Sequence, residues 1–204
     1  MKFKIVSLFV LCAILISCGT SRQGGKKQRK GTKAQVVLTP EQQRKYDYFF
    51  LEASRLKMKD DYSAAFDLLQ HCLTINPNAS SALYEISQYY MYLKQVPQGQ
   101  AALEKAVEND PDNYWYSQGL ASLYQQQNEM QKATNLLESM ATRFSDRMDP
   151  LYSLLDIYNR LEEYDNVITT LNRLEEKMGK NEQLSMEKFR IYLQKKDNQS
   201  AFRE

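Results

Sequence analysis

Glycine, proline and histidine are scarce in this chain of 204 residues. It contains seven Gly and five Pro, and a quarter of its residues are charged. This composition is typical of a soluble, helix-rich globular or repeat protein, and the length is sufficient for one core. The single histidine, His71, cannot supply a His-rich zinc site or an ordinary Ser-His-Asp arrangement with a spare ligand. The sequence therefore offers little material for a metal centre or a catalytic triad.

Long apolar runs are absent apart from a short one near the start. Lys2 and Lys4 form a charged region ahead of the apolar residues 8–16, which predicts a secretory signal peptide over residues 1–17. The apolar run is too short to span a bilayer. Residues 1–45 carry ten Lys and Arg against one acidic residue, whereas residues 46–204 carry seventeen against twenty-four. A basic arm ahead of an acidic body indicates two functional segments.

The signal peptide is followed at once by Leu15-Ile16-Ser17-Cys18-Gly19. This stretch resembles the lipobox of bacterial lipoproteins, in which a small residue precedes an invariant cysteine. The resemblance implies cleavage before Cys18, acylation of its thiol and of the new amino terminus, and stable anchoring by several acyl chains. Gly19 after that cysteine, rather than Asp, resembles lipoproteins sorted to the outer membrane. We therefore predict a lipid-anchored envelope protein at the outer membrane, facing the periplasm; the alternative is an ordinary signal peptide with a chance cysteine.

Cysteine is too rare for a disulfide framework. Cys12 lies in the predicted signal peptide and Cys18 would carry the lipid, so Cys72 alone remains as a thiol. An intramolecular disulfide is therefore impossible in the mature chain, even in an oxidising compartment. We expect the fold to be held together by packing.

The segment from residue 18 to residue 38 is predicted to be a flexible tether. Residues 19–33 contain no large apolar side chain and six Lys and Arg, so they have nothing to bury. These cations could contact anionic lipid headgroups beside the anchor, or the segment could act as a solvated spacer. We predict no nucleic-acid binding, because the segment lacks interleaved aromatic residues and the protein leaves the cytoplasm.

The folded part is predicted to begin at Thr39, which can cap a helix that starts at Pro40, with Gln42 completing a capping box. From residue 46 onward, a register of 34 residues aligns the remainder of the chain without a gap, in units that start at residues 46, 80, 114, 148 and 182. Small or apolar residues recur at the twentieth place of each unit, and leucine recurs at the twenty-fourth place of the first four: Ala65, Gly99, Ala133, Val167, Ala201; Leu69, Leu103, Leu137, Leu171. Such recurrence predicts two helices per unit that approach closely. Cys72, at the twenty-seventh place, is predicted to be a small buried hydrophobe rather than a nucleophile.

This pattern resembles the tetratricopeptide repeat, a family with a 34-residue period. The resemblance implies an all-α fold over residues 39–204, a right-handed superhelical solenoid of antiparallel helix pairs. Turns between units are clearest at residues 76–78 and 110–113, and turns within units at residues 60–62 and 162–164. Departures from the family pattern are Ser145 and Gly179 where proline is usual, Gly99 where alanine is usual, and Glu52 and Lys188 where the seventh place is usually apolar.

No motif in the sequence predicts catalysis. The paired glutamates at residues 162–163 and 175–176 fall in a polar turn and on an exposed helix face, which is typical of solvated charge. Residues 24–26 lack the spacing and setting of a phosphate-binding loop. We therefore predict a protein that is not an enzyme, with no cofactor, no metal ion and no small-molecule substrate.

The remaining candidate for function is the concave surface of the solenoid. In the tetratricopeptide family it is lined by the second, fifth, ninth, twelfth and thirteenth places of the first helix of each unit. Aromatic and amide side chains at these places suit capture of a protein or peptide, although several of the tyrosines could instead cover the helix interface. The resemblance places the following residues there: Phe50, Tyr84, Gln88, Met91, Tyr92, Trp115, Gln118, Ser122, Gln125, Tyr152, Asp156, Asn159 and Arg160.

The leading functional hypothesis is a membrane-anchored scaffold or adaptor that binds another protein in the bacterial cell envelope. The alternative is a targeting or regulatory subunit, or the N-terminal part, of an envelope enzyme such as one that remodels the cell wall. The fifth unit is incomplete, since its second helix would have about six residues from Gln199. We therefore expect a longer natural chain and fraying from about Asp197 onward.

Overall fold

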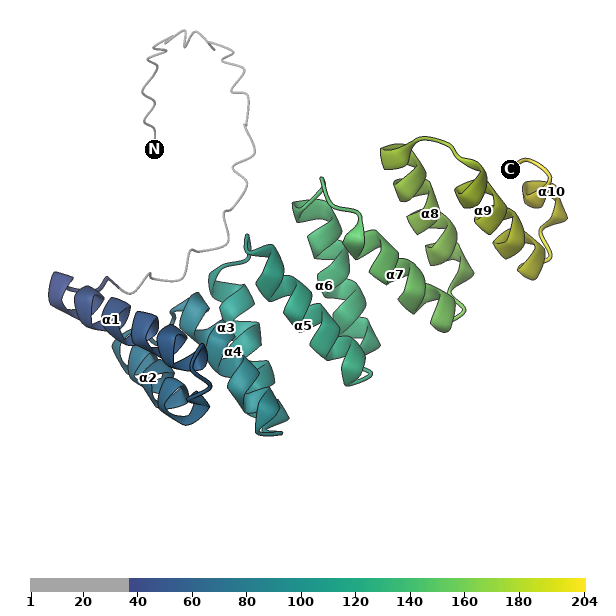
Figure 1. Cartoon of the computed structure of the whole chain (residues 1–204). Helices are drawn as coiled ribbons and strands as arrows, with labels where there is room; N and C mark the ends of the chain where they lie inside the picture. Colours follow the sequence, from purple (N-terminus) through teal and green to yellow (C-terminus); the bar gives the residue numbers. More distant parts are fainter. Residues whose placement is uncertain (1–36) are drawn as a thin grey trace, which may run out of the picture. The chain divides into compact units, whose positions relative to one another are not determined.

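The computed structural model describes residues 37–204 and shows helices joined by short turns (Figure 1). The predicted signal peptide, Cys18 and most of the predicted tether lie outside these residues. No strand occurs in the described part of the chain. Its ten helices are α1 (Pro40–Lys57), α2 (Tyr62–Ile75), α3 (Ser80–Tyr92), α4 (Val96–Asn109), α5 (Tyr114–Gln126), α6 (Met130–Arg143), α7 (Asp149–Arg160), α8 (Tyr164–Met178), α9 (Glu182–Gln194) and α10 (Asn198–Ala201).

Each odd-numbered helix and the even-numbered helix after it form one predicted 34-residue unit. Every helix packs against the next helix along the chain, so each pair also contacts the following pair (Figure 1). This arrangement confirms the predicted all-α solenoid of stacked helix pairs. None of the helices between residues 37 and 204 is long and apolar enough to cross a membrane.

The first helix begins where the sequence predicts it. The backbone N–H of Gln42 donates to Thr39 Oγ1 at 3.2 Å, and the backbone N–H of Thr39 donates to Gln42 Oε1 at 2.9 Å. With Pro40 at the first helical position, these two hydrogen bonds form the predicted capping box. The helix ends at Lys57.

The core consists of the places that recur in the sequence. Every residue at the twentieth place is buried, from Ala65 to Ala201, and so is every leucine at the twenty-fourth place. Small side chains at the twentieth place let the paired helices approach, and the leucines fill the space between them. The predicted packing of the units is therefore confirmed.

Two glycines that depart from the family pattern have structural explanations. A Cβ atom on Gly99 would lie 2.6 Å from Met91 Cε, because the Met91 side chain occupies the space that an alanine methyl group would take. Gly179 ends α8 with φ of 82°, a conformation that residues with a Cβ rarely adopt. Glycine at position 99 thus permits the close approach of Met91, and glycine at position 179 permits a positive φ.

The two charged residues at the seventh place differ in their surroundings. No described helix precedes α1, and Glu52 lies on its half-exposed side, where it accepts a hydrogen bond from Arg55 Nε at 2.7 Å. Lys188, in α9, is 3% exposed, and its Nζ lies 3.1 Å from Glu175 Oε2 and 2.5 Å from Glu204 Oε2. Glu52 therefore stays in contact with solvent, whereas the charge of Lys188 is balanced by two carboxylates inside the last unit.

The short second helix of the fifth unit, α10, has four residues and begins one residue before the predicted start. Asp197 caps it by accepting a hydrogen bond from the backbone N–H of Ser200 at 3.1 Å. Ala201 is buried against α9, as expected for the packing face, whereas Phe202 is 87% exposed. The expectation of fraying in this segment stays a prediction.

The tight turns within the units repeat one strained backbone position. At the fifteenth place of every unit φ is between 57° and 62°, and the residues there are Asp60, Lys94, Asn128, Glu162 and Lys196. The left-handed conformation costs a residue with a Cβ about 1–2 kcal/mol, and Asn and Asp tolerate it better than the others. None of the five positions has glycine, so each turn retains some strain.

We therefore expect Glu162→Gly to stabilise the protein. The relief of left-handed strain exceeds the added freedom of glycine in the unfolded chain, which leaves a net gain of about 0.5–1 kcal/mol. Asn128→Gly is the matched control and should give a smaller gain, because asparagine already tolerates this conformation. Urea unfolding followed by circular dichroism measures both variants. Equal effects at the two positions would contradict this explanation.

Candidate functional site

The candidate binding surface is the first-helix face. We define it as the second, fifth, ninth, twelfth and thirteenth places of the five units, which fall on or at the ends of α1, α3, α5, α7 and α9. None of the predicted residues on this face is fully buried. Tyr92, Trp115 and Tyr152 are 80%, 61% and 48% exposed. Gln88, Ser122, Asp156, Asn159 and Arg160 are also exposed, whereas Phe50, Tyr84, Met91, Gln118 and Gln125 are half-buried.

Three of the half-buried residues also pack against their neighbours. The ring of Phe50 stacks on that of Tyr46 with centroids 5.9 Å apart, and the ring of Tyr84 stacks on that of Tyr116 at 4.8 Å. The Met91 methyl group lies against Gly99. These side chains therefore have a packing role and present only part of their surface. Trp115, Tyr92 and Tyr152 present more of theirs.

The ten repeat places at the centre of the first-helix face hold no charged residue. In units two and three, the ten places hold Ser81, Tyr84, Gln88, Met91, Tyr92, Trp115, Gln118, Ser122, Gln125 and Gln126. Charged residues return in the flanking units, for example Lys57, which lies 2.7 Å from Glu85, and Arg160, which lies 3.8 Å from Asp156. A quarter of the residues in the chain are charged, whereas the ten central places offer aromatic surface and amide hydrogen-bonding groups.

Trp115 is held by a cluster that the sequence analysis did not identify. Its ring meets the ring of Tyr114 at 81°, with centroids 5.4 Å apart. The guanidinium carbon of Arg147 lies 3.9 Å from the Tyr114 ring centroid and 5.5 Å from that of Trp115. Cation–π contacts of this kind favour one orientation of the exposed indole. Arg147 lies in a turn between units and outside the repeating places, so no periodic signal points to it.

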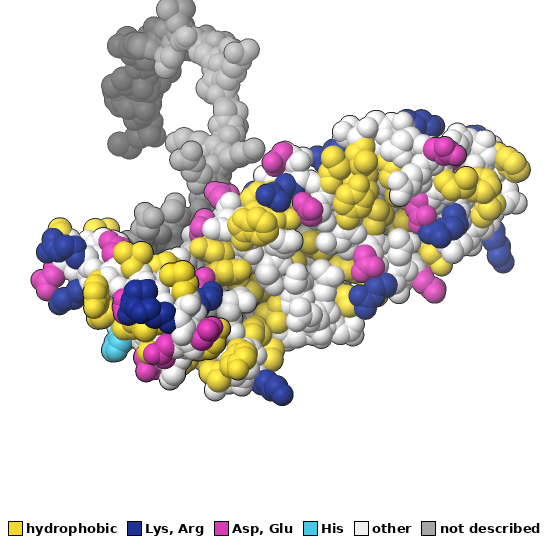
Figure 2. Space-filling view, in the orientation of Figure 1, with side chains coloured by type: hydrophobic (Ala, Val, Ile, Leu, Met, Phe, Trp, Pro, Cys, Tyr) yellow, Lys and Arg dark blue, Asp and Glu magenta, His cyan; other side chains and the backbone are white. Residues whose placement is uncertain are grey.

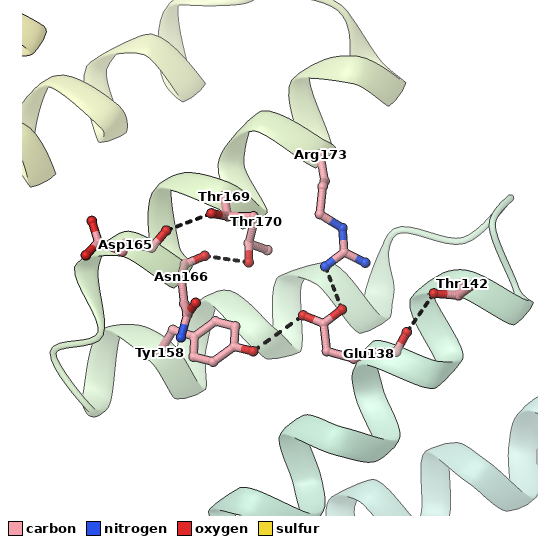
Figure 3. A network of polar contacts seen from close by, with 8 residues as sticks. All are labelled: Glu138, Thr142, Tyr158, Asp165, Asn166, Thr169, Thr170 and Arg173. Atoms are coloured by element: carbon pink, nitrogen blue, oxygen red, sulfur yellow. Dashed lines mark hydrogen bonds and ion pairs between the residues drawn. The ribbon is translucent and has the colours of Figure 1, made fainter.

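A polar network lies where units three and four meet, in α6, α7 and α8 (Figure 3). Tyr158 Oη donates to Glu138 Oε1 at 3.4 Å, and Arg173 Nη1 donates to Glu138 Oε2 at 2.7 Å. Tyr124 Oη donates to Glu104 Oε1 at 2.9 Å one unit earlier, so the tyrosine–glutamate contact repeats. Burial raises the pKa of Tyr158, and the neighbouring Glu138 carboxylate raises it further. This tyrosine therefore stays protonated and joins the units rather than acting as a base.

A polar cleft of about 190 Å³ adjoins this network. The hydrogen bonds of Glu138 in this network are made to protein groups. The cleft is mainly polar and lies between repeats. Its lining residues are Gln131, Thr134, Asn135, Glu138, Tyr158, Leu161, Glu163 and Asn166.

Cys72 and His71, the residues best suited to thiol or metal chemistry, lie in different surroundings. Cys72 is fully buried, its Sγ lies 3.8 Å from the Tyr46 carbonyl oxygen, and burial raises the pKa of its thiol to about 11. His71 is exposed, and its ring lies 5.6 Å from that of Phe49. Among residues 37–204, no group of three His, Cys, Asp or Glu is placed to hold a metal ion. The prediction that Cys72 is buried is confirmed, and its protonated thiol is a poor nucleophile.

Figure 2 shows how the side chains are distributed over one side of the molecule. Apolar side chains form several separate patches along the helices, with polar and charged side chains between them. A surface of separate patches suits contacts with a partner at several points better than one deep pocket for a small molecule.

Comparison with known proteins supports the repeat assignment. Residues 80–113, the whole of the second unit, match the family model described as "Tetratricopeptide repeat". No curated protein sequence gives a significant match.

Solved structures share the fold at low sequence identity. A MamA structure is 18% identical with a TM-score of 0.59, over 79% of this chain and 88% of that one. A tetratricopeptide repeat protein from Parabacteroides merdae is 15% identical with a TM-score of 0.60, over 78% of this chain and 64% of that one. YrrB, described as a tetratricopeptide repeat protein with an unusual peptide-binding site, is 13% identical with a TM-score of 0.58, over 79% of this chain and 84% of that one. The chain thus has the fold of tetratricopeptide repeat proteins.

Proposed function

We propose that this protein is a non-catalytic scaffold that binds a segment of another protein on its first-helix face. The uncharged centre of that face, with exposed Trp115 and Tyr92, is the observation that carries the proposal. Exposed aromatic rings supply large contact areas at a low entropy cost, and nearby amides can hydrogen-bond an extended backbone. The peptide-binding site named for YrrB is consistent with such a role.

The site of action that we propose is the bacterial cell envelope. The lipobox at residues 15–18 supports a lipid anchor at Cys18, and Gly19 supports sorting to the outer membrane with the solenoid in the periplasm. The basic residues 19–33 would link the anchor to the helices. A lipid-anchored solenoid of this kind recruits a partner to the membrane.

We expect Tyr92→Ala together with Trp115→Ala to abolish partner capture and to leave the helical circular-dichroism signal unchanged, because both side chains are exposed. A photo-crosslinking residue at the exposed Ser122, introduced in cells, reports capture, and mass spectrometry identifies the captured protein. Tyr62→Ala is the matched control, because Tyr62 is an exposed aromatic residue on α2, outside the first-helix face. Undiminished capture by the double variant would contradict the proposed site, and a large loss of helicity would show that the two rings belong to the core.

A further inference from the structure

The outer side of α1 is the end face of the described helix stack. At the seventh place, the first helices of units two to four have Ile86, Leu120 and Leu154, all buried. The same side of α1 is open: Tyr48 is 63% exposed and its neighbour Leu51 is 68% exposed. A terminal repeat needs a polar outer face to stay soluble, so two large exposed apolar residues at this end require an explanation.

The charges around Tyr48 follow a symmetric order along the helix. Glu41, Arg44, Tyr48, Glu52 and Arg55 are spaced by three and four residues, which places them on one stripe of α1. Glu41 and Arg55 are each seven residues from Tyr48, and Arg44 and Glu52 are each four residues from it. At a separation of seven residues, Glu41 precedes Tyr48 and Arg55 follows it; at four residues, Arg44 precedes it and Glu52 follows it. In each of these two pairs the charges are opposite.

We propose that this stripe binds a second copy of the chain, with the two α1 helices antiparallel and a two-fold axis beside Tyr48. In this arrangement Glu41 of each copy faces Arg55 of the other, and Arg44 faces Glu52. A parallel arrangement would place like charges opposite each other, so the charge order selects the antiparallel pair. Such an interface is self-complementary, as the two-fold symmetry of a homodimer requires.

The existing contacts of these side chains leave them free to change partners. Lys45 Nζ lies 2.9 Å from Glu41 Oε1 on the exposed side of the helix, and Arg55 donates to both carboxylate oxygens of the half-exposed Glu52. Exposed pairs of this kind contribute little, so exchanging them for pairs across the interface costs little. Lys45 and Leu51 are each three residues from Tyr48, so the aliphatic stem of Lys45 in one copy can cover Leu51 in the other.

The contact is limited to one helix from each copy. The stripe from residue 41 to residue 55 is about 21 Å long at the helical rise per residue. An interface of this size falls in the range of weak, reversible association. The dimer therefore forms in proportion to local concentration. It is independent of the proposed binding at the centre of the first-helix face, which lies on α3 and α5.

A cysteine on the symmetry axis tests the proposal directly. Tyr48→Cys in the full chain should form a disulfide-linked dimer under mild oxidation, because residue 48 of one copy faces residue 48 of the other. Tyr62→Cys is the matched control, an exposed position of the same residue type away from the stripe. The parent chain gives the background from its own cysteines. Linkage at position 48 that does not exceed linkage at position 62 overturns the proposal.

Charge reversal then distinguishes the antiparallel pair from chance collisions. Arg55→Glu added to Tyr48→Cys should lower the linked fraction roughly tenfold, because two symmetry-related pairs become repulsive. Adding Glu41→Arg restores opposite charges across the axis and should restore linkage. All these positions are at the surface of α1, so the helical circular-dichroism signal should stay constant. An unchanged linked fraction in Arg55→Glu, or no recovery with Glu41→Arg, overturns the proposed arrangement.

Discussion

Lys188→Ala is expected to destabilise the fifth unit by about 3 kcal/mol, at the low end of the range for breaking a buried ion pair. Lys188 is almost fully buried in α9, and its Nζ contacts the carboxylates of Glu175 and Glu204. Burial alone would lower the pKa of Lys188, but hydrogen bonds and charge from Glu204 and Glu175 raise the pKa above its usual value. The lysine is therefore charged in the fold, and its removal leaves two carboxylates without their cation.

The loss should be local, because each repeat contacts its neighbours alone. Hydrogen exchange measures it: amides of α9 and the end of α8 should exchange faster in the variant, and amides of α3 to α5 should not change. Lys188→Met keeps most of the side-chain volume and removes the charge, so it separates the ion pair from packing. If Lys188→Met behaves like the parent chain, packing rather than charge holds this unit together. Unchanged exchange in Lys188→Ala would contradict the structural role altogether.

Cys18→Ala is expected to release the protein from the membrane fraction or to stall its processing. This prediction rests on residues 15–18, which resemble a lipobox, and on our proposal that the Cys18 thiol is acylated. Each buried CH₂ of an acyl chain contributes roughly 0.8 kcal/mol, so loss of several chains removes nearly all membrane affinity. Cell fractionation and gel mobility measure the change.

The matched control for Cys18→Ala is Cys12→Ala, because Cys12 lies within the apolar region of the predicted signal peptide and receives no lipid in the proposal. This control should be processed and anchored like the parent chain. A Cys18→Ala protein that fractionates and migrates like the parent would show that the chain is not lipidated at this residue.

Part of the candidate site could be predicted from the repeat register and part could not. The register placed Tyr92, Trp115 and Tyr152 on a helix face away from the core, and all three are exposed. It could not distinguish them from Tyr84 and Met91, which are half-buried. Exposure at these places depends on which neighbour stacks against the ring or methyl group, and that neighbour belongs to another helix.

The sequence by itself determined the unit length, the start of the first helix and the core places, because these depend on local chemistry that repeats. Thr39 and Gln42 cap the first helix through neighbours three residues apart, and the twentieth and twenty-fourth places are buried wherever small and leucine side chains recur.

Only the tertiary structure decided which side chains far apart in the sequence meet. Arg147 lies over Tyr114, Glu138 joins Tyr158 to Arg173, and Lys188 lies between Glu175 and Glu204. These partners are separated by 13 to 35 residues in the chain, as Glu175 from Lys188 and Glu138 from Arg173 illustrate. The contacts that join different units depend on the angle at which one helix pair packs on the next. That angle follows from side-chain packing across each interface rather than from the period of the sequence.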